Sequence, residues 1–264
     1  MRAFRIRRFS RHHRSNPVVR RLAGVCEKFL NGYYNEGFFD FAENGEEKVV
    51  NILSPSFALD VGANYGEWTL AVLRQNPQAL VACFEIVPET ARVLRARLAD
   101  RANVHIYDLG LSSRAGEATV YWNKAIDGMS SLTWLPHAHF SAEPVACQLE
   151  TGDAVVGQLG WPTIDILKLD VEGHEVDVLT GFAGTLDSSR APAVIQFEYG
   201  MTYIPARHTL HEVYGKLGSR YAIGRLYPDG VDFKEYDAVD DHFRMGNYIA
   251  VRRDTNLSTK LSRF

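Results

Sequence analysis

Short apolar runs alternate with amphipathic segments through most of this 264-residue chain, and this alternation limits its fold more than any other feature. The runs "FALDV" at 57–61, "LVACFE" at 80–85 and "TIDILKLD" at 163–170 are each followed by a stretch with helical periodicity. Nearly continuous apolar strands separated by helices are typical of a parallel sheet that is covered on both faces. The chain is therefore predicted to be an α/β protein with a mostly parallel sheet of about seven strands and helices on both faces.

The end of this pattern differs from its beginning. An acidic stretch without a helical period joins the runs "YAIGRL" at 221–226 and "GNYIAVR" at 246–252, so one strand is expected to run antiparallel. The segment "GEATVYW" at 116–122 has the composition of an added strand, and turn formers follow it. We expect an insertion at about 117–150.

Composition and charge indicate one domain with a distinct beginning. With 46% hydrophobic residues the chain can bury one large core, which we place at 56–253, followed by a tail at 254–264. Asn16 and Pro17 have the pattern of a helix start, so a helical cap is expected at 16–55. Eight arginines and no acid occur in the first 25 residues, and 1–15 is predicted to be a disordered basic arm.

The sequence also limits the compartment and the partners. No run of about 18 apolar residues is present, so no membrane-spanning helix is expected. Three cysteines far apart in sequence favour neither a disulfide framework nor structural zinc, which indicates a reducing, cytoplasmic setting. The basic arm is consistent with peripheral contact with an anionic membrane, or with a signal that targets the protein to an organelle. The oligomeric state cannot be predicted from the sequence.

The stretch "DVGANYG" follows the first strand, at the edge where ligands bind in open parallel sheets. Gly62 and Gly66 permit backbone conformations and close approaches that a Cβ would block, and Asn64 tolerates a left-handed conformation. The spacing differs from the G-x-G-x-x-G of dinucleotide-binding proteins. Asp60 would repel a phosphate and attract a sulfonium or ammonium group, so a positively charged ligand is predicted.

Two further acids follow the next strands. Glu85 ends "LVACFE", where a carboxylate can accept both hydrogens of a ribose diol. Asp108 follows "NVHIY", where it could face an adenine amine. An amino acid, a ribose and an adenine together describe S-adenosylmethionine, which we predict as the cofactor.

Four segments resemble the FkbM family of S-adenosylmethionine-dependent methyltransferases: "DVGANYGEWT", "FEIVPET", "DLGLSSRAGEATVY" and "IDILKLDVEGHEVDVLTGF". The resemblance covers roughly residues 40–252. It implies the class I methyltransferase (Rossmann-like) fold and methyl transfer to a hydroxyl oxygen, often of a sugar or a polyketide. The segment "TGDAVV" departs from the family, which commonly has a Leu-Asp-Asp turn there.

The acceptor half of the site is predicted around "LKLDVEGHE". Asp170 ends a strand, and Glu172 and His174 follow within one turn, so a group that accepts the hydroxyl proton is expected among these three. The alternative is that the acids after the strand only cap a helix, whose dipole favours negative charge at its start. For substrate contact we predict the side chains Ser130 and Ser131 in the insertion and Glu198 and Tyr199 in "QFEYG".

Other functions are less consistent with the sequence. The groups "HAH" at 137–139 and "DDH" at 240–242 have no third ligand at a fixed spacing, so no required metal is predicted. A nicotinamide-dependent oxidoreductase and a noncatalytic S-adenosylmethionine-binding module remain alternatives on the same fold. Nucleic acid is not expected as a partner, because the core is acidic and the Asn-Pro-Pro-aromatic motif of base methyltransferases is absent. A small molecule or glycan that offers a hydroxyl group is the expected acceptor.

Overall fold

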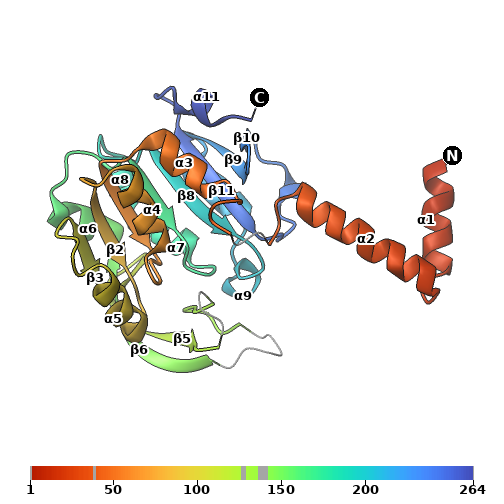
Figure 1. The fold of residues 1–264 in the computed structure, drawn as a ribbon, viewed down its shortest axis with the longest axis horizontal. Helices are drawn as coiled ribbons and strands as arrows, with labels where there is room; N and C mark the ends of the chain where they lie inside the picture. The colour runs from red at the N-terminus through yellow and green to blue at the C-terminus, as the bar shows by residue number, and fades with distance from the viewer. Residues whose placement is uncertain (1, 38–39, 126–128, 136–141, 264) are drawn as a thin grey trace.

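A computed structural model of the chain describes residues 2–37, 40–125, 129–135 and 142–263. Its centre is an eight-stranded sheet with the strand order β10-β9-β11-β8-β7-β1-β2-β3 (Figure 1). The strands are β1 (Phe57–Val61), β2 (Leu80–Phe84), β3 (Val104–Tyr107), β7 (Ile166–Leu169), β8 (Val194–Tyr199), β9 (Tyr221–Tyr227), β10 (Gly230–Phe233) and β11 (Gly246–Arg252).

The strand directions follow the predicted pattern. β1 pairs in parallel with β2 and β7, β2 with β3, and β7 with β8. β11 is antiparallel to both of its neighbours, β8 and β9, as expected for the run at 246–252. The predicted α/β fold with a mostly parallel sheet is confirmed, and the carboxyl ends of β1, β2, β7 and β8 lie along one edge.

The structure adds one strand, β10, to the seven that were predicted. It pairs antiparallel with β9 at the edge of the sheet and lies inside the acidic stretch that was expected to be only a connection. Val231 is buried, whereas Asp232 and Phe233 are partly exposed. Two apolar residues among acids are too few to produce a recognisable alternation.

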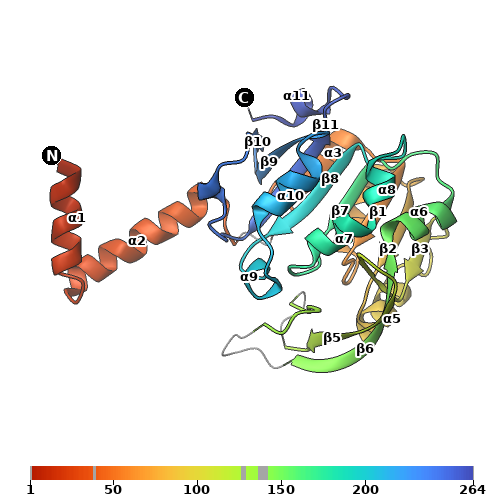
Figure 2. The same cartoon turned by 180° about the vertical axis from the view of Figure 1, so that it is seen from behind.

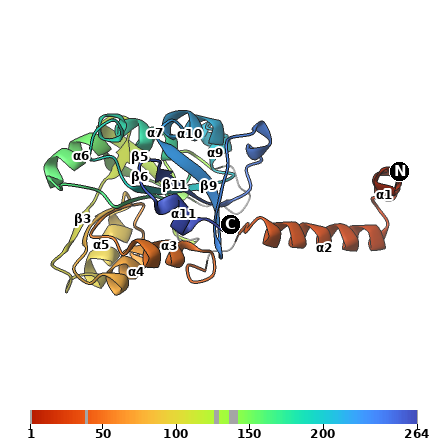
Figure 3. The same ribbon diagram turned by 90° about the horizontal axis from the view of Figure 1, so that it is seen from above.

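Helices cover both faces of the sheet, and each face has its own apolar core (Figure 3). The helices packed on one face are α3 (Glu46–Leu53), α4 (Glu67–Gln75), α5 (Pro88–Arg97) and α11 (Leu257–Leu261). The other face holds α6 (Gly152–Leu159), α7 (Glu175–Gly181), α8 (Ala183–Leu186) and α10 (Leu210–Leu217). The short helices α9 (Tyr203–Ala206) and η1 (Ala238–Asp240) lie in connections near the carboxyl ends of the strands.

The predicted insertion forms a second, three-stranded sheet (Figure 2). Its strands are β4 (Gly110–Ser112), β5 (Gly116–Asn123) and β6 (Ala142–Thr151), in the order β4-β6-β5. The strand expected at 116–122 is β5, whereas β6 was not predicted. Val120 and Cys147 of this sheet pack against Val87, which follows β2. The insertion is thereby held beside the carboxyl edge of the large sheet.

The N-terminal segment departs most from expectation. Residues 1–15 were predicted to be disordered, but α1 (Arg2–His12) is helical, because this stretch is free of glycine and proline and rich in arginine, a good helix former. α2 (Pro17–Tyr33) begins as predicted, with the Asn16 side chain accepting from the backbone N–H of Val18 at 2.9 Å. α1 and α2 project from the body rather than covering it (Figures 1 and 3). Among the described helices, none has the length and apolar character needed to cross a membrane.

Candidate active site

The glycine loop that follows β1 is shaped by contacts with two neighbouring strands. Gly62 has φ +83°, and its N–H donates to the carbonyl of Phe84 at 2.9 Å. A Cβ at this position would overlap the backbone carbonyl of Asp170. Only glycine therefore lets the loop after β1 lie against the loop after β7.

Glu85 connects the first loop to the second. Its carboxylate accepts from the N–H of Asn64 at 2.8 Å and from the N–H of Val87 at 2.9 Å. Asn64 holds the left-handed conformation that was predicted for it, with φ +47°. Burial raises the pKa of Glu85 to about 7, although the two backbone N–H groups oppose that rise.

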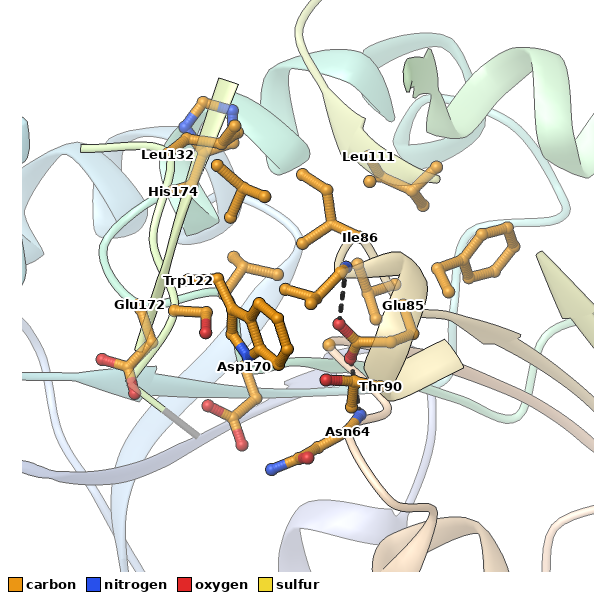
Figure 4. A pocket seen from close by; sticks show the side chains of 18 of the residues that line it. Asn64, Glu85, Ile86, Thr90, Leu111, Trp122, Leu132, Asp170, Glu172 and His174 are labelled. Carbon is orange, nitrogen blue, oxygen red and sulfur yellow. Dashed lines mark hydrogen bonds between the residues drawn. The ribbon is translucent and has the colours of Figure 1, made fainter. Parts of the chain in front are cut away.

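These loops border a pocket whose empty space, including its open mouth, is about 780 Å³. Figure 4 shows Glu85 and Ile86 on one side of the view and the carboxylates of Asp170 and Glu172 on the other. Apolar side chains supply much of the rest of the lining: Val61, Phe84, Ile86, Val87, Leu111, Val120, Trp122, Leu132 and Val171. The predicted residues Gly62, Asn64, Glu85, Asp170, Glu172, His174 and Ser130 all line this pocket.

Asp60, by contrast, lies beneath the loop and does not line the pocket. Its side chain is 0% exposed, accepts from the hydroxyl of Thr69 at 2.7 Å and lies 3.6 Å from the ammonium nitrogen of Lys168. Burial raises the pKa of Asp60. The expected direct contact with a cationic ligand is therefore corrected, because the partner of Asp60 is a lysine of the protein.

Gly66 and Asp108 also lie outside the set of lining residues. Gly66 precedes α4 with φ +80°, and a Cβ there would come within 2.6 Å of the Leu94 side chain, so packing accounts for this glycine. Asp108 pairs with Arg95 at 2.5 Å on the outside of the domain. Its expected place beside an adenine stays a prediction, and its carboxylate pairs with this arginine.

Lys168 is a site residue that was not predicted. It is buried in β7 with its ammonium nitrogen 3.0 Å from Asp170 and 3.6 Å from Asp60. Burial alone would lower the pKa of Lys168, but the nearby carboxylates of Asp170, Asp60 and Glu46 outweigh it and raise the pKa. The signal in the sequence was a lysine inside the apolar run "DILKLD", where a charge needs a partner.

Glu172 occupies a strained turn after β7. It has φ +53°, and its side chain oxygen Oε2 is buried without a hydrogen-bond partner among the described residues. Burial, followed by the charges of Asp170 and Glu175, raises the pKa of Glu172 well above its ordinary value. Glu175 is fully buried and accepts from the N–H of Val171 at 3.0 Å, so it fastens the turn before α7 rather than capping that helix.

His174 is held at both ring nitrogens. Nδ1 lies 3.3 Å from the carboxylate of Asp177, and Nε2 lies 2.9 Å from the hydroxyl of Ser112. Burial lowers the pKa of His174, which favours the neutral ring. Either Nε2 accepts from the Ser112 hydroxyl or it donates to it, depending on the tautomer of the ring. This arrangement suits a positioning role better than proton transfer.

The two predicted serines have different places. Ser130 lines the pocket, and its hydroxyl accepts from the N–H of Asn123 at 3.4 Å. Ser131 is buried, and its hydroxyl donates to the backbone carbonyl of Glu172 at 2.8 Å. Ser131 therefore fastens the insertion to the turn after β7, and its expected substrate contact is corrected to a structural bond.

Glu198 and Tyr199 point to opposite faces of β8, as adjacent strand residues do. Glu198 lines a second hollow of about 520 Å³. Tyr199 is fully buried on the α10 side, where its hydroxyl donates to Asp241 at 3.1 Å. The predicted substrate role of Tyr199 is therefore corrected, and Asp241 of the "DDH" group is held by this bond. His137 and His139 of "HAH" lie outside the described residues.

The second hollow adjoins the pocket through Asp170, which lines both. Its other described lining residues include Asn35, Asn44, Glu46, Glu198 and Asn247. At the boundary, one carboxylate oxygen from each of Asp170, Glu172 and Glu198 lies within 4.8 Å of the others. This group has the ligand type of a divalent cation site, although no metal was predicted.

Comparison with known sequences settles the family. The sequence profile described as "Methyltransferase FkbM domain" matches residues 60–222. The chain belongs to the FkbM methyltransferase family. The resemblance seen in the sequence is thereby confirmed, together with the class I methyltransferase fold and S-adenosylmethionine as the cofactor. The alternative of a nicotinamide-dependent oxidoreductase is removed.

Several curated proteins are similar to this FkbM methyltransferase. It is 28% identical over 200 residues to the AMB antimetabolite synthetase AmbE of Pseudomonas aeruginosa, a match that covers 62% of this chain and 9% of AmbE. It is 26% identical to the 2-O-methyltransferase NoeI of Sinorhizobium fredii, covering 50% of this chain and 59% of NoeI. It is also 26% identical to the hexuronic acid methyltransferase AglP of Haloferax volcanii, covering 66% and 71%.

Solved structures resemble this FkbM methyltransferase in fold. The methyltransferase FkbM of Methylobacillus flagellatus has a TM-score of 0.46 and 13% identity, over 75% of this chain and 44% of that chain. An O-methyltransferase from Bacillus cereus in complex with SAH has a TM-score of 0.45 and 11% identity, over 78% of each chain.

Proposed function

We propose that this protein transfers a methyl group from S-adenosylmethionine to a hydroxyl oxygen of a sugar-like acceptor. The observation that carries the proposal is the position of Asp170, which lines both the pocket of about 780 Å³ and the polar hollow of about 520 Å³. A residue at the boundary of two such spaces can touch a donor in one and an acceptor in the other.

The pocket offers the groups that the donor requires. Ile86, Val87 and Leu111 supply an apolar end for a purine, and Glu85 lies beside them where it can accept from ribose hydroxyls. Asp170 and Glu172 supply negative charge at the end where a sulfonium would lie. Asp60 contributes indirectly, because it holds Lys168 and so positions Asp170.

The hollow favours a polar acceptor. Asn35, Asn44 and Asn247 make this lining polar, and their amide nitrogens donate to backbone carbonyls or to Glu46 within the protein. Glu46 and Glu198 add carboxylates, which accept from hydroxyls and repel an acid. A neutral or amino-bearing sugar fits this lining better than a carboxylated one. The similarity to a 2-O-methyltransferase supports an O-directed reaction. The similarity to a hexuronic acid methyltransferase supports a sugar as the class of acceptor, although the acidic lining here disfavours the carboxylate of such a sugar.

Asp170 is the proposed proton acceptor. As the acceptor oxygen forms its bond to the methyl carbon and the carbon–sulfur bond breaks, Asp170 takes the hydroxyl proton and S-adenosylhomocysteine remains. A positioned base contributes about 10²–10⁴ in rate. Alignment of the two reactants in adjoining spaces can supply about 7–11 kcal/mol more.

The test is methyl transfer from radiolabelled S-adenosylmethionine to a panel of neutral sugars, amino sugars, uronic acids and polyketide alcohols. We expect product with neutral or amino sugars and little with uronic acids. Titration calorimetry with the donor runs in parallel. Donor binding without any transfer would instead indicate the noncatalytic module, and no donor binding would contradict the proposal.

We also propose that α1 and α2 contact an anionic membrane surface. Val18, Leu22, Val25, Phe29 and Tyr33 lie along α2 at helical spacing and are 58–75% exposed. The first 33 residues contain eight arginines, one lysine and one acid. An apolar stripe on a basic helix is typical of membrane-surface binding, and the shared positive charge opposes pairing with a second copy.

A further inference from the structure

Three carboxylates from two strand ends converge at the boundary between the pocket and the hollow. Asp170 and Glu172 follow β7, and Glu198 is the second-last residue of the neighbouring strand β8. One oxygen of each lies within 4.8 Å of the other two. Like charges this close repel one another unless a proton or a cation lies between them.

Glu172 provides a second, independent observation. Its side chain is only 9% exposed, yet its oxygen Oε2 is buried without a hydrogen-bond partner among the described residues. A buried carboxylate oxygen left without a partner is costly. The backbone at Glu172 is itself strained, with φ +53°. The fold therefore keeps this side chain in place despite both the backbone strain and the unpaired buried oxygen. Such an oxygen calls for a ligand that the chain does not supply.

The surrounding charges indicate that this ligand is positively charged. Glu46, Asp60 and Glu175 are further buried acids whose charges act on this cluster. Lys168 is the buried cation beside them, and it is already engaged by Asp170 and Asp60. The charge of Lys168 also acts on Glu172, but the ion pairs of Lys168 are with Asp170 and Asp60, not with Glu172 or Glu198.

We infer that Asp170, Glu172 and Glu198 bind a divalent cation with a preference for oxygen ligands, such as Mg²⁺, Mn²⁺ or Ca²⁺. Three carboxylates are the donor set that these hard cations prefer, and the absence of sulfur and imidazole from the cluster disfavours zinc. The open side toward the hollow leaves positions for water or an acceptor hydroxyl.

The site deepens the proposed function, and its catalytic role rests on that function. A cation there lowers the pKa of an acceptor hydroxyl and fixes the oxygen beside the donor pocket. The hydroxyl proton still passes to Asp170, so no further reactant is needed.

The experiment is a titration of the full-length, metal-free protein with Mn²⁺ alone, followed by the electron paramagnetic resonance signal of free Mn²⁺. We expect one saturable Mn²⁺ per chain, displaced by Mg²⁺ or Ca²⁺. Loss of an outer partner of a metal ligand already costs about 10–100-fold in affinity, so Glu198→Gln and Glu172→Gln should each lose at least tenfold.

Glu235→Gln is the matched control, because Glu235 is 90% exposed and pairs only loosely with Arg253 at 3.4 Å. Its Mn²⁺ affinity should equal that of the parent protein. Melting curves check that each variant is folded. If Glu198→Gln does not fold, the Mn²⁺ affinity of Glu172→Gln still tests the inference. No saturable Mn²⁺, or equal affinity in all variants, overturns the inference.

Donor binding is measured separately in the presence of a chelator. Mn²⁺ binding without donor binding would leave the cation site standing and remove the proposed methyl transfer. If the chelated protein binds the donor and transfers methyl, and no Mn²⁺ binds, the proposed methyl transfer stands and the cation site is removed. The two proposals can thus fail independently.

Discussion

The Lys168 ammonium nitrogen lies 3.0 Å from the Asp170 carboxylate, inside β7 and at the floor of the proposed active site. The same nitrogen lies 3.6 Å from Asp60 in the neighbouring β1. The buried ammonium of Lys168 therefore pairs both with Asp60, beneath the loop, and with Asp170, in the pocket lining. Substitution of Lys168, Asp60 or Asp170 should accordingly affect stability and activity to different extents.

Lys168→Met should be strongly destabilising. Because it leaves Asp60 buried without its partner, we expect the free energy of unfolding to fall by about 3–5 kcal/mol, measured by urea denaturation. Lys216→Met on the exposed side of α10 is the control and should change stability by less than about 0.5 kcal/mol. A loss under about 1 kcal/mol for Lys168→Met would show that Asp60 is satisfied in another way.

Glu85 and Asp60 should differ in their effect on donor binding. Glu85→Ala removes a carboxylate from the pocket lining, so affinity for S-adenosylmethionine should fall roughly ten- to hundredfold, as expected for a charged hydrogen bond worth about 1.5–3 kcal/mol. Asp60→Asn should lower the melting temperature and leave the affinity of the folded protein within about twofold, because Asp60 does not line the pocket. Titration calorimetry decides, and equal losses in both variants would contradict this assignment.

Asp170→Asn should separate turnover from donor binding. The substitution keeps the size of the side chain and removes the base, so single-turnover methyl transfer should slow by about 10²–10⁴. Donor affinity should change much less, since Glu85 and the glycine loop are untouched. Asp108→Asn is the control, because Asp108 also follows a strand but faces Arg95 outside the pocket. Near-parental turnover in Asp170→Asn would rule out its role as base.

Stability should fall as pH rises from about 5 to about 8. The pKa of Glu175 is raised to about 8 by burial, so the folded state binds a proton in this window that the unfolded state has released. The unfolding free energy then declines with pH, by at most about 1.4 kcal/mol per unit for each such group. Glu175→Gln, which mimics the protonated form, should flatten the decline. Denaturation at several pH values tests this, and an unchanged slope would contradict it.

Leu22→Glu combined with Phe29→Glu should reduce binding to phosphatidylserine vesicles severalfold without changing the melting temperature. Both side chains are at least 62% exposed on α2, so their replacement removes apolar contact with lipid and little with the protein. Binding by the parent should weaken with added salt. Val239→Glu on the body is the control. Vesicle sedimentation that is equal for parent and double variant would exclude this surface.

The sequence predicts where strands occur along the chain and which residues follow them. These predictions place Gly62, Glu85 and Asp170 correctly at the carboxyl edge of the sheet. It does not predict the direction in which a side chain points. Asp60 and Tyr199 were expected in the site because of their position near strand ends, but both face away from it. Adjacent strand residues alternate between faces, and the face toward the ligand depends on the pairing of the whole sheet.

The second hollow shows another limit. Glu46 and Asn247 are bonded to each other at 3.0 Å although 201 positions separate them in the chain. No local period or spacing connects such residues, because β11 reaches the centre of the sheet only through its pairing with β8 and β9. The acceptor side of the site therefore becomes visible only in three dimensions.

The bond from Ser131 to the turn after β7 ends on the backbone carbonyl of Glu172, not on its side chain. The backbone carbonyl of Glu172 thus anchors the inserted sheet, whereas the side chain of the same residue supplies the carboxylate at the site. A substitution at 172 can change the charge at the site while the insertion stays fastened. Conversely, the insertion can be redesigned around Ser131 without altering which acid faces the pocket, so the two parts of this site are free to diversify separately.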